Sequence, residues 1–279
     1  MATLHLVATP IGNLEDITRR AVRVLGEVRH VAAEDTRRSG LLLQHLGIRA
    51  DLISLHAHNE AARLDTVLGW LDAGEDVALV TDAGTPLISD PGGRLVAAVA
   101  EAGHTVVPVP GPSAVLAALV GSGLPVDRFA FLGFVPRKGT ARASTLERIA
   151  GSQETCVLFE SPERLVALLE ALETTLEKGR RVAVARELTK LHEEFRRGTA
   201  GELAAYYKAT PPKGEVTVVV AAAEEPAEEV DPAVARARAQ ALLSDGLRPS
   251  QVAKELAREL GIPRNRAYEV VHELKGDIA

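Results

Sequence analysis

The loop at residues 81–93 has the residue types of a ligand-binding loop. The apolar run VALV at 77–80 breaks into TDAGTPLISDPGG, which is rich in glycine and proline. This pattern indicates a buried strand whose carboxyl end opens into a loop. Glycine lets backbone amides approach a ligand because no Cβ intervenes. The loop has neither the GxGxxG spacing of a dinucleotide site nor the GK[ST] of a P-loop. We therefore expect it to cradle an uncharged or amphoteric ligand.

Two further loops have a similar composition. TPIGN at 9–13 and PGPS at 110–113 each follow an apolar run that predicts a strand. In open α/β sheets the ligand crevice lies beyond the carboxyl ends of the strands. The three loops are therefore expected to converge on one crevice. The alternative is that each is an ordinary strand-to-helix turn.

The motif EDTR at 34–37 places two carboxylates and a guanidinium at the end of a predicted strand. Glu34, Asp35 and Arg37 could bind ribose hydroxyls or a phosphate, or a carboxylate could act as a general base. The same residues could equally cap a helix and form a surface ion pair. Both interpretations stay open from the sequence.

The motif HAHNE at 56–60 is a second polar cluster. His56 and His58 lack further ligands at metal-site spacing, and the chain has no HExxH motif, so we expect no metal. His56, Asn59 and Glu60 are instead candidates for a polar loop that contacts the substrate.

Cations are frequent in the second half of the chain. They could contact a phosphate backbone, or form a solvated face paired with Glu187, Glu193 and Glu194. The residues concerned are Arg137, Lys138, Arg180, Arg181, Arg186, Lys190, Arg196 and Arg197.

The overall composition limits the class of protein. The chain has 279 residues, of which 46% are hydrophobic and 3% aromatic, with a formal net charge of −6. This charge argues against a protein whose whole surface binds nucleic acid, but it leaves room for a local basic face. No apolar run is long enough to span a bilayer, and the N-terminus reads as a strand and not as a signal peptide. The single cysteine, Cys156, fits a reducing compartment, so we expect a cytoplasmic protein.

The elements that must position these motifs alternate along the chain. Strands are expected at 4–8, 28–33, 52–55, 77–80, 105–109, 129–134, 155–159, 181–185 and 216–222, with helices between most of them. Strands that alternate with helices predict an α/β fold with a largely parallel, helix-covered sheet. Helix N-caps are expected at Asp16 or Thr18, and at Thr36, Asn59 and Ser161.

The expected organisation is two α/β domains with mainly parallel or mixed sheets and a small helical tail. Residues 1–120 would form the first domain and 121–223 the second. The acidic, proline-containing stretch 224–230 would be a linker. Residues 231–279 would form the tail, in which helices at 251–260 and 264–274 flank Gly261 as in a helix-turn-helix.

The ordered set of motifs closely resembles one enzyme family. The segments are TPIGNLEDIT at 9–18, AEDTR at 33–37, HNE at 58–60, residues 81–93, PGPSA at 110–114, FESP at 159–162 and RELTK at 186–190. Together they resemble the ribosomal RNA small subunit methyltransferase I family, within the tetrapyrrole-methylase-like superfamily of S-adenosylmethionine (SAM) enzymes.

The resemblance implies a fold, a cofactor and a reaction. SAM would bind in the cleft between two α/β domains of a homodimer, without a metal. The reaction would be 2′-O-methylation of a cytidine ribose in the decoding region of small-subunit (16S) ribosomal RNA. By position, the residues expected to contact SAM are Pro10, Gly12, Ala83, Gly84, Thr85, Ile88, Ser113, Ala114, Phe159, Glu160 and Leu188.

The substrate side follows from the chemistry of methyl transfer. A sulfonium is a good leaving group, so the protein mainly positions the reactants, and a basic side chain could assist deprotonation of a weakly nucleophilic ribose hydroxyl. The catalytic candidates are Asp35, Glu60, His56 and Lys190, with Glu34 and Glu187 also considered. The expected substrate-binding residues are Glu34, Arg37, Asn59, Arg186, Arg137 and Lys138.

Two other functions compete with this interpretation. One is a tetrapyrrole or corrin-pathway C-methyltransferase. Relatives of that kind commonly carry an Asp where this chain has Thr85, and their substrates need neither a basic second domain nor a helical tail. The other is a regulator that binds nucleic acid through residues 231–279, which are close to charge-balanced.

Overall fold

Five parallel strands form the first sheet of the computed structural model, which describes residues 2–223, 231–262 and 264–276. The strand order is β3-β2-β4-β1-β5, and every pairing is parallel. The strands are β1 (Thr3–Val7), β2 (His30–Ala33), β3 (Asp51–Ser54), β4 (Val77–Val80) and β5 (Thr105–Val109). Because all five run the same way, the loops that follow them emerge at one edge.

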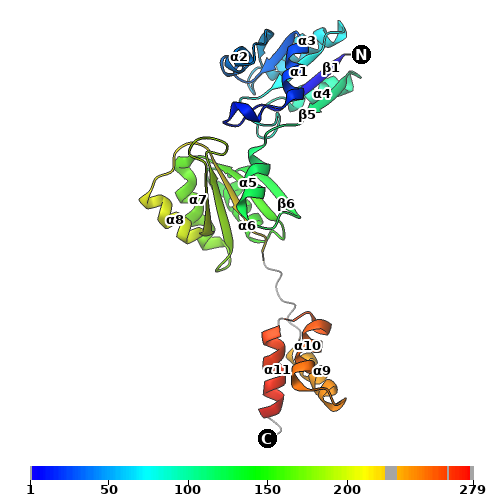
Figure 1. Cartoon of the computed structure of the whole chain (residues 1–279), viewed down its shortest axis with the longest axis vertical. Coiled ribbons are helices and arrows are strands. Elements are labelled where there is room, and N and C mark those ends of the chain that lie inside the picture. Colours follow the sequence, from blue (N-terminus) through cyan, green and yellow to red (C-terminus); the bar gives the residue numbers. More distant parts are fainter. Residues whose placement is uncertain (1, 224–230, 263, 277–279) are drawn as a thin grey trace. The chain divides into compact units, whose positions relative to one another are not determined.

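Helices cover both faces of this sheet (Figure 1). The helices α1 (Arg19–Glu27) and α2 (Thr36–His45) pack on one face, and α3 (Glu60–Asp72) and α4 (Gly93–Glu101) on the other. In β4, Ala78 and Val80 face the first pair, whereas Val77 and Leu79 face the second. This alternation follows from the two-residue period of a strand. A short 3-10 helix, Leu14–Asp16, precedes α1.

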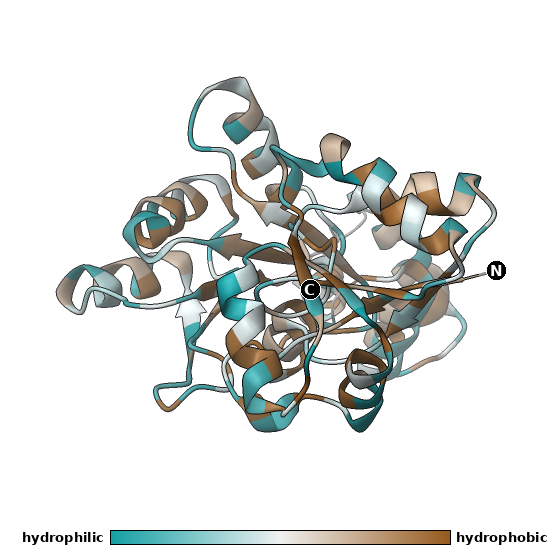
Figure 2. Ribbon diagram, turned by 90° about the horizontal axis from the view of Figure 1, so that it is seen from above, coloured by the Kyte–Doolittle hydropathy of each residue, from teal (hydrophilic) through white to brown (hydrophobic). Residues whose placement is uncertain are grey.

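The second sheet is mixed. Its order is β6-β7-β10-β8-β9; β6 and β7 are parallel, and the other neighbours are antiparallel. The strands are β6 (Phe129–Phe134), β7 (Thr155–Glu160), β8 (Arg181–Arg186), β9 (Glu194–Thr199) and β10 (Val216–Val220). Many strand segments of the molecule carry the colour of apolar residues in Figure 2. In the second sheet, β7, β8 and β10 consist mostly of buried residues.

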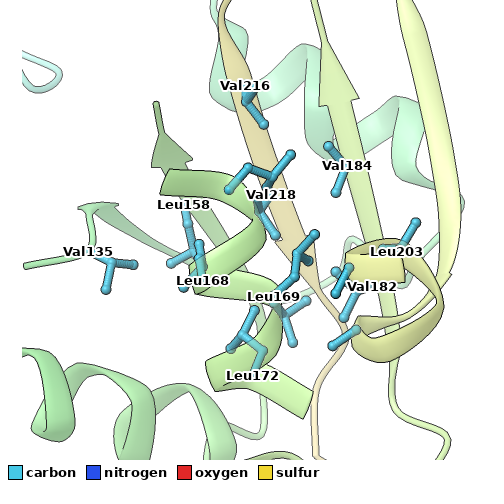
Figure 3. Packing of buried hydrophobic residues seen from close by; sticks show 14 of the residues in the cluster. Val135, Leu158, Leu168, Leu169, Leu172, Val182, Val184, Leu203, Val216 and Val218 are labelled. Atoms are coloured by element: carbon cyan, nitrogen blue, oxygen red, sulfur yellow. The ribbon is translucent and has the colours of Figure 1, made fainter. Parts of the chain in front are cut away.

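The helix that follows β5 packs on the second sheet and not on the first. Val115, Ala118 and Leu119 of α5 (Ala114–Ser122) join the apolar cluster that includes Val157 of β7 and Val219 of β10. The opposite face is covered by α6 (Gly139–Ala150), α7 (Pro162–Thr175) and α8 (Ala200–Ala209). Figure 3 shows leucines of α7 packed against valines of β8 and β10.

The C-terminal helices form a separate unit. The chain divides into two compact units, Met1–Ala223 and Glu224–Ala279. The second unit contains α9 (Pro232–Ser244), α10 (Pro249–Leu260) and α11 (Arg264–Gly276), which share an apolar core of their own. Gly261 ends α10 with φ +66°, a left-handed conformation that suits glycine. The linker expected at 224–230 lies outside the described residues.

All nine expected strands occur within two residues of their predicted bounds, but the sequence patterns did not predict β9 and α8. The sequence of β9, EFRRGT, has the charged residues that are typical of a surface segment. The strand lies at the edge of the second sheet, and edge strands often carry charges because these discourage pairing with another chain. The cap expected at Thr36 is also wrong by one residue. Asp35 is the N-cap of α2, and its side chain accepts a hydrogen bond from the amide of Arg37.

The leucine core of the second sheet should dominate the stability of this part of the chain. Leu168 is fully buried, so Leu168→Ala should lower the free energy of unfolding by about 2–5 kcal/mol, because a cavity replaces the side chain. Leu191→Ala is the matched control, since Leu191 is 94% exposed. Urea denaturation of the full chain measures both; equal unfolding midpoints for the two variants would contradict the packing shown in Figure 3.

Candidate active site

The three loops expected to converge are joined by hydrogen bonds. The amide of Thr9 donates to the carbonyl of Gly84 at 2.9 Å, and the amide of Gly84 donates to the carbonyl of Thr9 at 3.0 Å. The Thr85 hydroxyl donates to the carbonyl of Pro112 at 3.2 Å. The loops after β1, β4 and β5 therefore form one assembly at the carboxyl edge of the first sheet.

These loops form one side of a cavity of about 360 Å³, and the second sheet forms the other. Phe134 and Phe159 supply an aromatic wall, with ring centroids 5.6 Å apart. The lining residues are Ile11, Ala83, Gly84, Thr85, Ile88, Ser89, Asp90, Ser113, Ala114, Val115, Phe134, Phe159, Glu160, Ser161, Pro162, Gly214, Glu215, Val216 and Thr217. No lysine, arginine or histidine is among them, whereas three carboxylates are.

Eight of the eleven residues expected to contact SAM line this cavity. They are Ala83, Gly84, Thr85, Ile88, Ser113, Ala114, Phe159 and Glu160. The other three lie nearby. Pro10 lines a second cavity of about 290 Å³, Leu188 is buried in the apolar cluster of α5, and Gly12 packs against Lys190.

The second cavity is lined by Thr9, the partner of Gly84 in the backbone bridge. Its walls combine apolar and polar side chains, and Nη1 of Arg38 lies 3.2 Å from Oδ2 of Asp82 in its lining. The lining residues are Thr9, Pro10, Leu14, Arg38, Ser39, Leu41, Leu42, Thr81 and Asp82. Thr9 therefore faces this cavity, while Gly84 faces the first.

The backbone of the loop after β4 adopts conformations that few side chains tolerate. Gly84 has φ +84°, and a Cβ placed on it would lie 3.3 Å from Cγ2 of Ile11. Leu87 and Ser89 also have positive φ, at +74° and +71°. Such conformations are costly for residues other than glycine, and they concentrate at functional sites. The strain lies in the loop that borders the cavity.

None of the four catalytic candidates lines either cavity, and two of them cap helices. The Asp35 carboxylate pairs with Arg37 at 2.7 Å, and hydrogen bonds from Arg37 hold its pKa well below the usual range. Oε1 of Glu60 accepts hydrogen bonds from the amides of Arg94 and Leu95. Gly92, the N-cap of α4, has no side chain that could accept hydrogen bonds from these amides, so Glu60 caps the helix instead.

Lys190, another catalytic candidate, is held in an ion-pair network. Its Nζ lies 2.8 Å from Oε1 of Glu187 and 3.2 Å from Oε2 of Glu215. Burial opposes the charge on Lys190, but the hydrogen bonds that it donates to the two glutamates outweigh this effect and raise its pKa. Lys190 is therefore a cation and a poor base at neutral pH. His56, the fourth candidate, donates its backbone amide to the side chain of Asn59.

Glu34 has a contact that the sequence does not reveal. Its Oε2 lies 3.0 Å from the Thr81 hydroxyl, which also lies 2.5 Å from Oδ2 of Asp90. Burial, followed by the negative charges of Glu34 and Asp82, raises the pKa of Asp90. Asp90 lines the cavity but is absent from the predicted site residues. The sequence signal that could have found it is its place in Ser89-Asp90-Pro91-Gly92, within the ligand loop.

Glu160 lies on the opposite wall with its charge compensated. Oε1 accepts a hydrogen bond from the Ser161 amide at 2.8 Å, and Oε2 lies 3.0 Å from Nη2 of Arg164. Burial raises the pKa of Glu160 even so. The buried carboxylate is thus fixed in place beside the cavity.

Most of the cations expected to bind phosphate are committed to partners within the protein. Arg186 and Arg196 both pair with Glu194, and Arg180 is buried against backbone carbonyls. Arg137 and Lys138 are exposed and form none of the ion pairs found in the described part of the chain. They follow Phe134, whose ring borders the cavity.

Two features are absent from residues 2–223, 231–262 and 264–276. No group of three or more His, Cys, Asp or Glu side chains is arranged there to hold a metal ion. No helix among these residues is both long and apolar enough to cross a membrane.

The conformation of Gly84 gives a testable prediction. Gly84→Ala should lower the free energy of unfolding by about 1–2 kcal/mol, because an alanine is strained in the left-handed region. Gly93→Ala is the control: Gly93 begins α4, and a Cβ there meets no atom within 4 Å. That variant should be neutral or slightly stabilising. Urea denaturation compares them, and equal stability of the two variants would refute the argument.

Comparison with known proteins places the chain among methyltransferases. The family model described as Tetrapyrrole (Corrin/Porphyrin) Methylases matches residues 3–204. Among solved structures, a uroporphyrin-III-C-methyltransferase from Thermus thermophilus has a TM-score of 0.57 at 22% identity, covering 78% of this chain and 94% of that one. A cobalt precorrin-4 methyltransferase has a TM-score of 0.60 at 17% identity, with the same coverage. These likenesses show the fold.

Curated relatives match over almost the whole chain. Ribosomal RNA small subunit methyltransferase I of a Synechocystis species is 47% identical over 278 residues, which is 99% of this chain and 100% of the relative. The protein of that name from Escherichia coli O157:H7 is 45% identical over 276 residues, or 98% and 96% of the two chains. With the tetrapyrrole-methylase fold and the cavity at the carboxyl edge of its first sheet, the chain belongs to the ribosomal RNA small subunit methyltransferase I family.

Proposed function

We propose that this protein uses SAM to methylate the 2′-hydroxyl of a cytidine ribose in the decoding region of small-subunit (16S) ribosomal RNA. The observation that carries the proposal is the cavity of about 360 Å³ between the two sheets, which combines a glycine-containing cradle, an aromatic wall and carboxylates without a lining cation. The family to which the chain belongs supports the reaction class.

The lining of the cavity fits the chemistry of SAM. A sulfonium and an α-amino group are positive, and the carboxylates of Glu160 and Glu215 on the second-sheet side of the cavity suit them. The absence of lining cations disfavours a polyphosphate ligand. The backbone of Ala83 and Gly84, the Ser113–Ala114 turn and the ring of Phe159 would hold the donor, with Glu160 on the opposite wall. Glycine at position 84 leaves this surface open, because a Cβ there would approach Ile11.

The residues of this chain mainly position the reactants. When bound, SAM supplies an activated methyl group on a good leaving group. The loops after β1, β4 and β5 are cross-linked by hydrogen bonds, so they form a rigid frame for in-line transfer. The aromatic pair Phe134 and Phe159 would give the donor an apolar surface on one side of the cavity.

A corrin-pathway C-methyltransferase is the second candidate. Three solved structures with this fold are named as uroporphyrin-III or cobalt precorrin-4 methyltransferases, but their identity to this chain is only 17–22%. The relatives at 39–47% identity over nearly the full length are named for ribosomal RNA. Thr85, where an acid is common in tetrapyrrole enzymes, also favours the RNA substrate.

We also infer a homodimer. Leu116 and Val120 are 51% and 71% exposed on α5, whose other side packs on the second sheet. Exposed apolar side chains on one helix suit a protein contact. Light scattering tests the inference through a mass of about twice the 29.6 kDa of one chain.

The reaction is tested by mapping the missing methyl group. Ribosomal RNA from cells that lack this protein should lose one 2′-O-methylcytidine from the decoding region. The purified protein with methyl-labelled SAM should restore it on small ribosomal subunits, and should leave precorrins unlabelled. Label on a precorrin, or an unchanged methylation map, would contradict the proposal.

The exposed cations give a prediction for RNA binding. The double variant Arg137→Ala/Lys138→Ala should weaken binding to small subunits, and should make the slope of log K against log salt shallower by about 1.4 to about 1.8, because two phosphate contacts are lost. The control is Arg29→Ala/Arg49→Ala, which removes two cations from the opposite edge of the first sheet. A slope equal to that of the unsubstituted protein would contradict this assignment.

A further inference from the structure

Asp90 differs from the other two carboxylates that line the cavity of about 360 Å³, here called the large cavity. Glu160 is paired with Arg164, and Glu215 is paired with Lys190 and has a side chain that is 68% exposed. Asp90 forms none of the ion pairs found among the described residues, and its hydrogen-bond partner is the hydroxyl of Thr81. It is therefore the carboxylate in this cavity whose charge no neighbouring cation neutralises.

Thr81 fixes the position of Asp90. Thr81 is buried directly after β4, and it receives a hydrogen bond on its carbonyl from the hydroxyl of Thr9. Its own Oγ1 lies 2.5 Å from Oδ2 of Asp90 and 3.0 Å from Oε2 of Glu34. One hydroxyl has one proton, so it can donate to only one of these two carboxylates at a time.

The geometry also brings Glu34 close to Asp90. Glu34 follows β2 and Thr81 follows β4, and these strands pair with Ala33 opposite Val80. The carboxylates of Glu34 and Asp90 therefore both contact the hydroxyl of Thr81 at the ends of adjacent strands. Like charges and burial both disfavour ionisation, and the pKa of Asp90 is raised by burial first and then by Glu34 and Asp82. A carboxylate whose pKa is closer to the working pH is a better proton acceptor.

We propose that Asp90 is the general base that accepts the proton of the acceptor hydroxyl, and that Thr81 and Glu34 are positioning residues for it. This inference rests on the proposed methyl transfer to a ribose oxygen. As the oxygen–carbon bond forms, the carbon–sulfur bond breaks and its electron pair stays on sulfur, which becomes a neutral thioether. The proton of the hydroxyl passes to a carboxylate oxygen of Asp90.

The carboxylates singled out from the sequence are less suited to this role. Asp35 and Glu187 have lowered pKa values, because hydrogen bonds from Arg37 and Lys190 respectively stabilise their charged forms. Oε1 of Glu60 already accepts hydrogen bonds from the two amides of Arg94 and Leu95 in the first turn of α4. Of these three carboxylates, none borders the large cavity.

The first test is Asp90→Asn, which keeps the shape of the side chain and removes its basicity. With saturating SAM and small subunits that lack the methyl group, the single-turnover rate should fall by about 100-fold or more. The dissociation constant for SAM should change by less than about threefold. The unfolding temperature at neutral pH should stay the same or rise, because the folded state no longer holds a charge that burial penalises.

The matched control is Asp65→Asn. Asp65 lies on the exposed side of α3 and lines neither cavity, so this variant should keep the single-turnover rate of the unsubstituted protein. A similar loss in both variants would show a general effect of the substitution and would overturn the proposal.

The second test is the pH profile, which a purely structural role would not change. The rate should fall on the acid side as Asp90 is protonated. Glu34→Gln removes a negative charge near Asp90, so the acid limb should move to lower pH, whereas Asp90→Asn should abolish it. Thr81→Val should lower the single-turnover rate without a comparable loss of SAM affinity.

Three results would overturn the proposal while leaving the proposed function intact. They are an Asp90→Asn variant that methylates at the normal rate, one that loses SAM affinity tenfold yet reacts normally at saturation, and an acid limb that survives the substitution. If the unsubstituted protein fails to methylate small subunits, the proposed function itself is wrong, and the two failures are thereby distinguished.

Discussion

The pair of backbone hydrogen bonds between Thr9 and Gly84 is the constraint on which the site depends. It joins the loops that follow β1 and β4, which are neighbouring strands in the first sheet. Its two residues line different cavities, Gly84 the first and Thr9 the second. Gly84 has a left-handed backbone in this bridge, a conformation that glycine adopts without the strain that a Cβ would add.

The second constraint is the path of the chain after β5. Because α5 packs on the second sheet, its N-terminal turn lies between the loops of the first sheet and the strands of the second. The cavity therefore combines two kinds of wall. The first sheet supplies backbone and small side chains, and the second supplies Phe159 and a buried, compensated Glu160. This division fits a family whose members must bind a donor with both apolar and charged parts.

Hydrogen bonds and ion pairs within the chain decide which polar side chains remain available for chemistry. Asp35, Glu60 and Lys190 looked suitable from their motifs, but each is engaged in a cap or an ion pair. Asp90 lies in a turn-forming stretch whose sequence does not mark it as a base, yet it borders the cavity and forms none of the ion pairs found among the described residues. The residue type is the same whether a carboxylate caps a helix or borders a cavity. Its pKa is set by hydrogen bonds to residues that are distant in the sequence.

The sequence by itself determined the alternation of strands and helices, the three loops at the carboxyl edge and eight of the nineteen residues that line the cavity. These features depend on local patterns: apolar runs, glycine and proline at strand ends, and ordered motifs that identify the family. The edge strand β9, the packing of α5 on the second sheet and the partners of each carboxylate were decided only by the tertiary structure. The physical reason is that they depend on contacts between residues far apart in the chain, such as Thr81 with Glu34, which no local pattern encodes.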